Sequence, residues 1–509
     1  MRKLSLSSGN WKTIVLVTLL VILGAAVVIT AWRIREITRD RAIRELQTRY
    51  SRPVDLESLS FSLLGSIRIS GRKLVIHDRQ PNAPAFISIQ SFSARIPYWG
   101  LFEEPLRLEA VELKGLRINV PTADQGNQPG HPTPKSPPPP PFIIENMAAD
   151  GAVLSILPKR PGGEPLVFDI KRLQLQSVGI HRPMKFQTVL INAKPPGLIN
   201  SQGQFGPWQQ DEPGYTPVSG SYTFSGADLG VFDGLSGKLS SKGGYNGILQ
   251  RIVVDGETDT PDFALDVSRN PVRLTTQFRA IVDGTDGDTL LEPIKAQFLR
   301  TSLIARGGVV GTPGRKGKSI RLDVNVTQSN VEDLLTLAMK TDKPPLVGGM
   351  VFSTDFDLPS GPEPVIRRLN LDGRFGISSA RFTDLEVQRK VNELSQRASV
   401  DKDENSNDEK VVSNLSGRFK LNNSNATFSQ LSFRVPGASV TLDGSFGLLN
   451  EKVDFQGKLK MDAKLSQTTT GVKSVFLKVV DPFFRKNGKT VLPIKINGTL
   501  DQPQFGLDF

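Results

Sequence analysis

Three aspartates in the segment VDGTDGDTL are spaced closely enough to hold a hard cation such as calcium: Asp283, Asp286 and Asp288. Aspartate and glycine are also the usual residues of tight turns, because both tolerate turn conformations. The segment follows a run of alternating residues that ends at Val282. We therefore expect a turn between two strands, and a cation site is the alternative.

Other groups that carry catalysis are scarce. The chain has no cysteine and three histidines, His77, His131 and His181, which leaves no disulfide scaffold and no thiolate chemistry. Gly317-Lys318-Ser319 and Gly488-Lys489-Thr490 look like ends of phosphate-binding loops, but both lack the upstream glycine at the required spacing. We predict that the protein is not an enzyme and holds no cofactor and no metal.

Composition favours a β-rich body. Only 38% of the 509 residues are hydrophobic, and the chain contains 46 glycines and 36 prolines, which break helices but are common between strands. The formal net charge is +12. Because the lysines and arginines are scattered singly along alternating segments, they indicate a solvated face, and we expect no nucleic-acid partner.

One uncharged segment, residues 14–32, is long enough to cross a bilayer, because nineteen residues at about 1.5 Å each span about 28 Å. We predict a short tail over residues 1–13 and a transmembrane helix with a juxtamembrane extension over residues 14–50. More arginines follow the segment than precede it, so charge alone would place the body in the cytoplasm. The predicted anchor residues are Ile14, Leu16, Leu19, Leu20, Ile22, Leu23, Val27, Ile29 and Trp32.

Strict alternation of apolar and polar residues predicts strands with one apolar and one wet face, which is typical of antiparallel sheets. It is clearest over residues 440–465, where Asn450 and Glu451 predict a hairpin turn. Residues 272–282 and 320–326 follow the same rule. The pattern changes phase between Ala110 and Val111, which predicts a bulge or a turn. The residues predicted to line one apolar surface are Val440, Leu442, Phe446, Leu448, Val453, Phe455, Leu459, Met461, Leu465, Ile494 and Ile496.

Few helices are expected in the body. Ser329 or Asn330 is positioned to cap a helix ending at Met339, Thr383 one that reaches about residue 397, and Ser466 one that reaches about residue 480. Nine prolines predict an extended loop over residues 121–141. The expected organisation is a first β segment (51–120), this loop (121–141), a central β body (142–374) and a C-terminal β region (375–509).

Both ends of the chain carry stretches that resemble the AsmA-like family of bacterial envelope proteins. Near the C-terminus these are ARFTDLEVQRKVNELSQRAS, VVSNLSGRFKLNNSNATFSQLSF, VPGASVTLDGSFGLLNEKVDFQGKLKMDAKLS and LPIKINGTLDQPQFGLDF. After the apolar segment come VDLESLSFSLLGSIRISGRKLVIHD and YWGLFEEPLRLEAVELKGLRINVP. The resemblance covers about half of the chain, and residues 151–364 match in texture only.

The resemblance implies a single-pass protein of the bacterial inner membrane with its body in the periplasm. It also implies a long antiparallel sheet, curved into a groove with an apolar lining, as in bridge-like lipid transfer proteins. Phospholipid would then be the ligand, and outer-membrane and envelope biogenesis the role. The alternatives are a non-enzymatic envelope scaffold that binds protein partners and an enzyme or cation-binding module. Periodicity alone cannot separate an open groove from a closed core.

Overall fold

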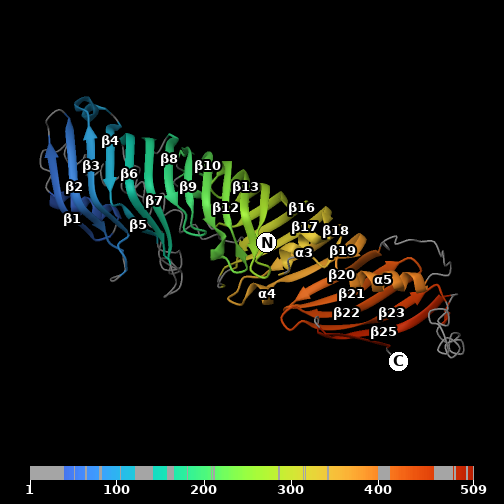
Figure 1. The fold of residues 1–509 in the computed structure, drawn as a ribbon. Helices are drawn as coiled ribbons and strands as arrows, with labels where there is room; N and C mark the ends of the chain where they lie inside the picture. The colour runs from blue at the N-terminus through green and yellow to red at the C-terminus, as the bar shows by residue number, and fades with distance from the viewer. Residues whose placement is uncertain are drawn as a thin grey trace. The chain divides into compact units, whose positions relative to one another are not determined.

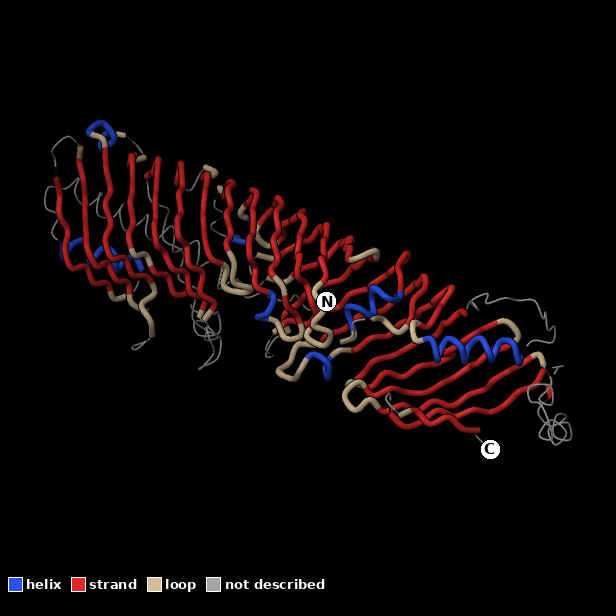
Figure 2. Tube along the Cα trace, in the orientation of Figure 1, coloured by secondary structure: helices blue, strands red, loops and turns tan. Residues whose placement is uncertain are grey.

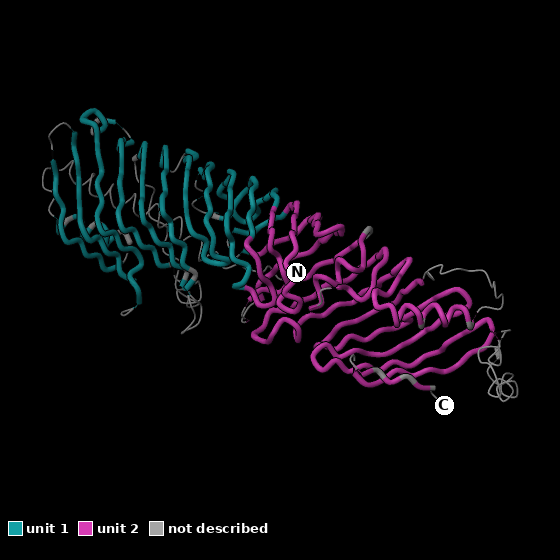
Figure 3. Tube along the Cα trace, in the orientation of Figure 1, with its two compact units in different colours: residues 1–231, 239–257, 280–287 teal, residues 232–238, 258–279, 288–509 magenta. Residues whose placement is uncertain are grey.

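The protein is mainly β in the computed structural model, which describes residues 39–50, 52–62, 66–78, 83–103, 105–120, 142–157, 165–179, 182–207, 209, 212–284, 287–312, 315, 317–340, 343–398, 413–463, 485–486, 489–499 and 502–507 (Figure 1). Two compact units are distinguished (Figure 3). Unit 1 comprises residues 1–231, 239–257 and 280–287, and unit 2 comprises residues 232–238, 258–279 and 288–509.

Unit 1 begins with helix α2 (Arg39–Tyr50), which confirms the last part of the predicted helical extension. Each strand then pairs mainly with a neighbour in sequence. The strands are β1 (Val54–Ser62), β2 (Ile67–Ile76), β3 (Ile87–Ile96), β4 (Leu106–Lys114), β5 (Arg117–Val120), β6 (Phe142–Ile156), β7 (Leu166–Val178), β8 (Met184–Ile191), β9 (Leu198–Phe205), β10 (Pro217–Asp228) and β12 (Lys238–Ile248). A 3-10 turn, η1 (Tyr98–Phe102), joins β3 to β4.

The prediction of antiparallel pairing is wrong at one place. Strand β6 runs parallel to β4 and β5, with Leu106 opposite Phe142 and Arg117 opposite Val153. A parallel neighbour requires a long crossover, and residues 121–141, between β5 and β6, supply the necessary length. Arg107 on β4 bonds Glu145 on β6 at 3.0 Å and Glu103 at 2.8 Å, and these bonds raise the pKa of Arg107.

Residues with positive φ form a row across β2, β4 and β6 of unit 1. The register pairs Arg72 with Ser91, Ser91 with Lys114, and Lys114 with Asp150. The residues that directly follow Arg72, Lys114 and Asp150 all have positive φ. They are Lys73 (47°), Gly115 (62°) and Gly151 (66°). The pairing register continues unbroken past Lys73 and Gly151, and Figure 2 shows the strands of this unit bending part-way along their length.

One face of these strands stays apolar on both sides of the row. On β2, Ile67 and Ile69 are buried before Lys73, and Leu74 and Ile76 after it. Burial therefore changes phase at Lys73, where φ is positive, while β2 stays in register with β1 and β3. The predicted phase change on β4 is confirmed, because burial passes from Leu106 and Leu108 to Val111 and Leu113. The pairing of β4 with β3 and β6 keeps one register there, so the change takes place without a bulge.

This face of unit 1 is a packed core. The side chains of Ile87, Ile96, Leu108 and Ile144 are fully buried, and α2 packs Ala42 and Leu46 into the same cluster. For β1 to β6 the structure therefore supports the closed-core interpretation of the alternating pattern. Residues farther along, such as Leu173 on β7 and Phe186 on β8, are only half-buried.

Strands β13 (Arg251–Leu265) and β14 (Val272–Val282) contribute to both units. Unit 2 also contains β11 (Leu235–Ser236), β15 (Thr289–Phe298), β16 (Thr301–Gly311), β17 (Lys318–Asn330), β18 (Leu346–Leu358), β19 (Asn370–Phe382), β20 (Ser413–Asn422), β21 (Asn425–Val435), β22 (Ala438–Gly447), β23 (Lys452–Met461), β24 (Arg485–Lys486), β25 (Lys489–Thr499) and β26 (Pro503–Leu507). From β15 to β26, the described strands pair antiparallel with their neighbours. The predicted strands over 272–282 and 320–326 and the hairpin at 450–451 are confirmed.

The helices of unit 2 are α3 (Val331–Ala338), α4 (Val365–Arg368) and α5 (Leu385–Ala398). Asn330 is the N-cap residue of α3 but makes no side-chain capping bond. The predicted cap of α5 is wrong. Asp384, not Thr383, accepts bonds from the amides of Glu386 (2.8 Å) and Val387 (3.0 Å), because its carboxylate stands one residue nearer to these amides.

Several predictions fall outside the described residues: the anchor at 14–32, the proline-rich loop at 121–141 and the helix at 466–480. Among the residues that are described, no helix is both long and apolar enough to span a bilayer.

Candidate functional site

One face of unit 2 collects most of the predicted surface residues. On β22 and β23, Val440 pairs with Leu459, Leu442 with Gly457, and Phe446 with Val453. On β25, Ile496 pairs with Phe455 and Ile494 with Gly457. Met461 lies at the end of β23 on the same face, and the polar residues between these positions are exposed along β23. We call this surface, formed by alternate residues of β15 to β25, the apolar face.

Two predicted members differ. Leu448 does not lie on a strand, because β22 ends at Gly447 and Leu448 belongs to the turn that follows. Its amide donates to the carbonyl of Ser424. The alternating pattern of the sequence continues into this turn, although residues 448–451 serve to reverse the chain between β22 and β23. Leu465 lies outside the described residues.

Sequence reasoning missed an aromatic row on the apolar face. Phe352 on β18 stacks on Phe419 of β20, with ring centroids 5.6 Å apart. Phe375 on β19 lies 6.4 Å from Phe419, and Phe428 on β21 lies 5.8 Å from Phe455. Each phenylalanine occupies an apolar position of an alternating segment, such as GRFGI or GRFKL. That signal was present, but cross-strand neighbours cannot be assigned without the register.

Glycines make room for these rings. Gly373 is the cross-strand partner of Phe419, and a β-carbon on Gly373 would stand 2.8 Å from Cζ of that ring. Phe419 can therefore lie across β19 and reach Phe352 on β18. Aromatic rings that cover cross-strand glycines are a known way of stabilising sheets. Here they also keep large side chains close to the sheet surface.

Helices cover one end of the apolar face. Val331 and Leu335 of α3 pack with Ile377, Ala380 and Met350. Val391 and Ala398 of α5 pack near the strand ends with Val435, Ala438 and Met461. Figure 2 shows both helices beside strand ends rather than strand centres. Away from these helices, Phe352, Phe428, Phe455, Ile494 and Ile496 are half-buried, so this part of the face keeps solvent contact.

The helix α3 is fixed by a buried carboxylate. Asp333, 2% exposed, accepts from the Thr301 hydroxyl at 3.0 Å and from the Arg300 amide at 2.9 Å. The Arg300 guanidinium bonds its other oxygen at 3.0 Å, and these acidic neighbours raise the pKa of Arg300. At the other end of the helix, the Asn270 amide donates to the carbonyls of Thr336 and Met339, both at 3.0 Å.

The opposite face is polar and carries cross-strand ion pairs. Lys420 bonds Asp372 at 2.8 Å, and Arg321 bonds Asp357 at 3.2 Å. On β13 and β14, Arg273 holds both carboxylate oxygens of Asp259, at 2.9 and 2.8 Å, which lowers the pKa of Asp259. Exposed pairs of this kind contribute little to stability. They mark this side of the sheet as the solvated one.

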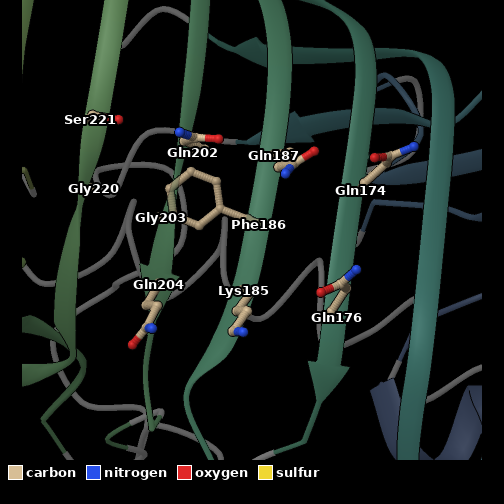
Figure 4. A pocket seen from close by; sticks show the side chains of 10 residues that line it. All are labelled: Gln174, Gln176, Lys185, Phe186, Gln187, Gln202, Gly203, Gln204, Gly220 and Ser221. Atoms are coloured by element: carbon tan, nitrogen blue, oxygen red, sulfur yellow. The ribbon is translucent and has the colours of Figure 1, made fainter.

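Two shallow hollows lie on the polar face of unit 1 and not on an apolar surface. One is lined by serines and charged residues of β1 to β4, including Ser60, Ser70 and Arg72. The other lies between two rows of polar side chains (Figure 4). One row consists of Gln174, Gln187 and Gln202, and the other of Gln176, Lys185 and Gln204. Both follow from ordinary spacing between side chains of neighbouring strands.

The aspartate cluster forms a turn. The amide of Gly287 bonds the carbonyl of Asp283 at 2.7 Å, between the end of β14 and the start of β15. The Asp288 carboxylate accepts from the Gly311 amide at 2.7 Å and from the Lys318 ammonium at 3.2 Å. Asp286 lies outside the described residues. The turn interpretation of this segment thus has direct support.

Packing against α3 and α5 accounts for only one end of the apolar face. Half-buried phenylalanine and isoleucine side chains lie together on β18 to β25, and such surfaces are commonly used for binding. Comparisons with protein-family models, with curated proteins and with solved structures found no match.

Proposed function

We propose that this protein is a non-enzymatic, membrane-anchored lipid-handling protein of the AsmA-like type, whose apolar face holds phospholipid acyl chains. The observation that carries the proposal is the half-buried row formed by Phe352, Phe428, Phe455 and their neighbours on the apolar face. A soluble sheet used only as a scaffold gains more stability from burying such residues completely.

The energetics suit passive handling. Each methylene that leaves water contributes about 0.8 kcal/mol, so a tail that exchanges bilayer for a protein surface of similar polarity needs little net driving force. The chain offers matching chemistry, because phenylalanine, isoleucine and leucine alternate along β22, β23 and β25 without an intervening charge on that side. Net transport would require a gradient or another energy source.

A supporting role fits the first part of unit 1 better. There the apolar side chains of β1 to β6 are fully packed, with α2 against them. We assign to this part the task of holding the sheet and joining it to the preceding segment. In the scaffold alternative, protein partners would bind the polar face or exposed strand edges.

The location is part of the same proposal. Residues 14–32 would anchor the chain in the bacterial inner membrane, with the body in the periplasm, where it would support outer-membrane and envelope biogenesis. A reporter fused after Phe509 tests the topology directly. Activity of a periplasm-dependent reporter such as alkaline phosphatase is expected, and activity only of a cytoplasmic reporter would refute the assignment.

Lipid extraction from the purified full-length protein tests the function. We expect mass spectrometry to find phospholipid in the wild-type protein and a severalfold smaller amount in the Phe455→Asp variant. Gln456→Asp is the matched control, because Gln456 is the adjacent residue on the exposed side of β23. Equal lipid content in the two variants, with both folded, would refute binding at the apolar face.

A further inference from the structure

The face of unit 1 that carries the packed core changes its chemistry along β8, β9, β10 and β12. Hydroxyl side chains occupy positions of this face on these four strands. Thr188, Ser201 and Tyr222 are direct cross-strand partners in one row. We call the following five residues the hydroxyl belt: Thr188, Ser201, Tyr222, Ser241 and Tyr245.

Every hydroxyl of the belt is paired within the protein. Ser201 donates to the carbonyl of Ser221 at 3.0 Å, so the phenol of Tyr245, 2.8 Å away, donates to Ser201. Ser241 likewise donates to the carbonyl of Glu257 at 3.0 Å, and Tyr222 donates to Ser241 at 3.1 Å. Thr188 donates to the carbonyl of Arg172 at 3.1 Å.

Glycines hold both phenols flat against the sheet. A β-carbon on Gly220 would stand 2.5 Å from Oη of Tyr245, and one on Gly243 would stand 3.1 Å from Cε1 of Tyr222. Tyr245 therefore lies over β10 and Tyr222 over β12. Burial raises the pKa of Tyr245, which agrees with its position against the sheet. The belt is a fixed surface and not a set of mobile side chains.

We infer, resting on the proposed function, that the hydroxyl belt interrupts acyl-chain contact with the protein. A phospholipid tail lies on the half-buried aliphatic and aromatic residues of β7, and others lie on the apolar face of unit 2, but none lies on the belt. A tail placed on the belt would strip the remaining water from oxygens that it cannot hydrogen-bond, which costs free energy. The belt thus marks a part of this face of unit 1 on which acyl chains do not lie.

Labelling with a photoreactive lipid tests this inference. The full-length protein is incubated with phosphatidylethanolamine vesicles that contain a diazirine-labelled acyl chain, irradiated and digested. Mass spectrometry then compares labelling of peptides that contain the belt with labelling of peptides from β7 and from β18 to β23. The carbene inserts into O–H as well as C–H bonds, so weak labelling of the belt reports distance from the chain. We expect severalfold less label on the belt.

A four-site variant, S201A/Y222F/S241A/Y245F, supplies the second arm. It replaces both members of each hydroxyl pair with apolar groups of similar shape, which is close to neutral for folding. We expect its belt peptides to be labelled as strongly as those of β7. Ser60→Ala is the control, because it removes an exposed hydroxyl of β1. Circular dichroism verifies that the variants are folded.

The outcomes separate the two proposals. Equal labelling of the belt and the flanking strands in the wild-type protein would overturn the belt inference and leave lipid binding intact. The same holds if the four-site variant keeps the wild-type pattern. If no peptide is labelled above the level of an unrelated soluble protein, both the belt inference and the proposed function fail.

Discussion

Gly444 and Phe455 are direct cross-strand partners on β22 and β23, and a β-carbon on Gly444 would stand 2.6 Å from Cδ1 of the Phe455 ring. The missing side chain allows the ring to lie across β22 toward Phe428, 5.8 Å away on β21. The position of this phenylalanine therefore depends on the absence of a single carbon atom in its neighbour.

Replacing Gly444 by alanine should lift the Phe455 ring away from β22 and strain the hairpin of β22 and β23. The added carbon would also lie 2.2 Å from the carbonyl oxygen of Asp454, so the backbone must shift. We expect a loss of about 1–3 kcal/mol in the free energy of unfolding, measured by urea denaturation. Gly506→Ala is the control, because a β-carbon there meets nothing within 4 Å. Equal effects at the two sites would contradict the packing described here.

Removing the carboxylate of Asp333 should release α3. In Asp333→Ala the Thr301 hydroxyl and the Arg300 amide lose their buried acceptor, and a buried donor left without a partner costs about 1–3 kcal/mol. Because Arg300 itself is exposed, the main loss is the acceptor of the buried Thr301 hydroxyl, and we expect faster hydrogen–deuterium exchange over residues 331–338. Asp372→Ala, which removes an exposed pair with Lys420, should leave exchange in α3 unchanged. Continued protection of α3 without Asp333 would show that the bonds of Asp333 to Arg300 and Thr301 are not needed to hold the helix.

The phenol of Tyr245 should titrate above the ordinary value for tyrosine. Burial raises its pKa, and the Ser201 hydroxyl opposes the shift. Because the folded-state pKa is raised, the related stability is complete below about pH 10 and is lost as pH rises through the folded value. A spectrophotometric titration should therefore lose its latest component in Tyr245→Phe and shift it higher in Ser201→Ala. A titration that Tyr245→Phe leaves unchanged would contradict the assignment.

The ion pair of Asp259 with Arg273 should appear as an acid-dependent contribution to stability. Arg273 lowers the pKa of Asp259 below the reference value of 3.8, so the contribution is present above that pH and is lost as pH falls through the folded value. Asp259→Asn and Arg273→Gln should each weaken the pH dependence of the urea midpoint below about pH 4 by a similar small amount. Different behaviour of the two variants would show that other partners dominate.

Alternation predicted the strands because side chains two residues apart share a face whatever the partner strand is. It therefore placed Val453, Phe455 and Leu459 on one side of β23 correctly. The same pattern ran on to Leu448, which a turn removes from the strand. The local sequence also predicted α3. For α5 it predicted Thr383 as the N-cap instead of Asp384, because the two adjacent residues differ only in which amides their side chains can reach.

What the sequence could not provide depends on the register between strands. The row of positive-φ residues Lys73, Gly115 and Gly151 is evident only once β2, β3, β4 and β6 are aligned. The pairs Tyr222–Ser241 and Ser201–Tyr245 join residues 19 and 44 positions apart. Whether an alternating face is packed or half-open also depends on which helices cover it, and periodicity carries no information on that point.

The most direct test of the central claim places a photoreactive residue on the apolar face. We propose to introduce p-benzoylphenylalanine at position 455 or at position 456 of the full-length protein in cells, irradiate, purify and measure the intact mass. We expect a phospholipid adduct at position 455 and none above background at position 456, on the other side of β23. Equal adducts at both positions, or none at 455 in a folded protein, would contradict it.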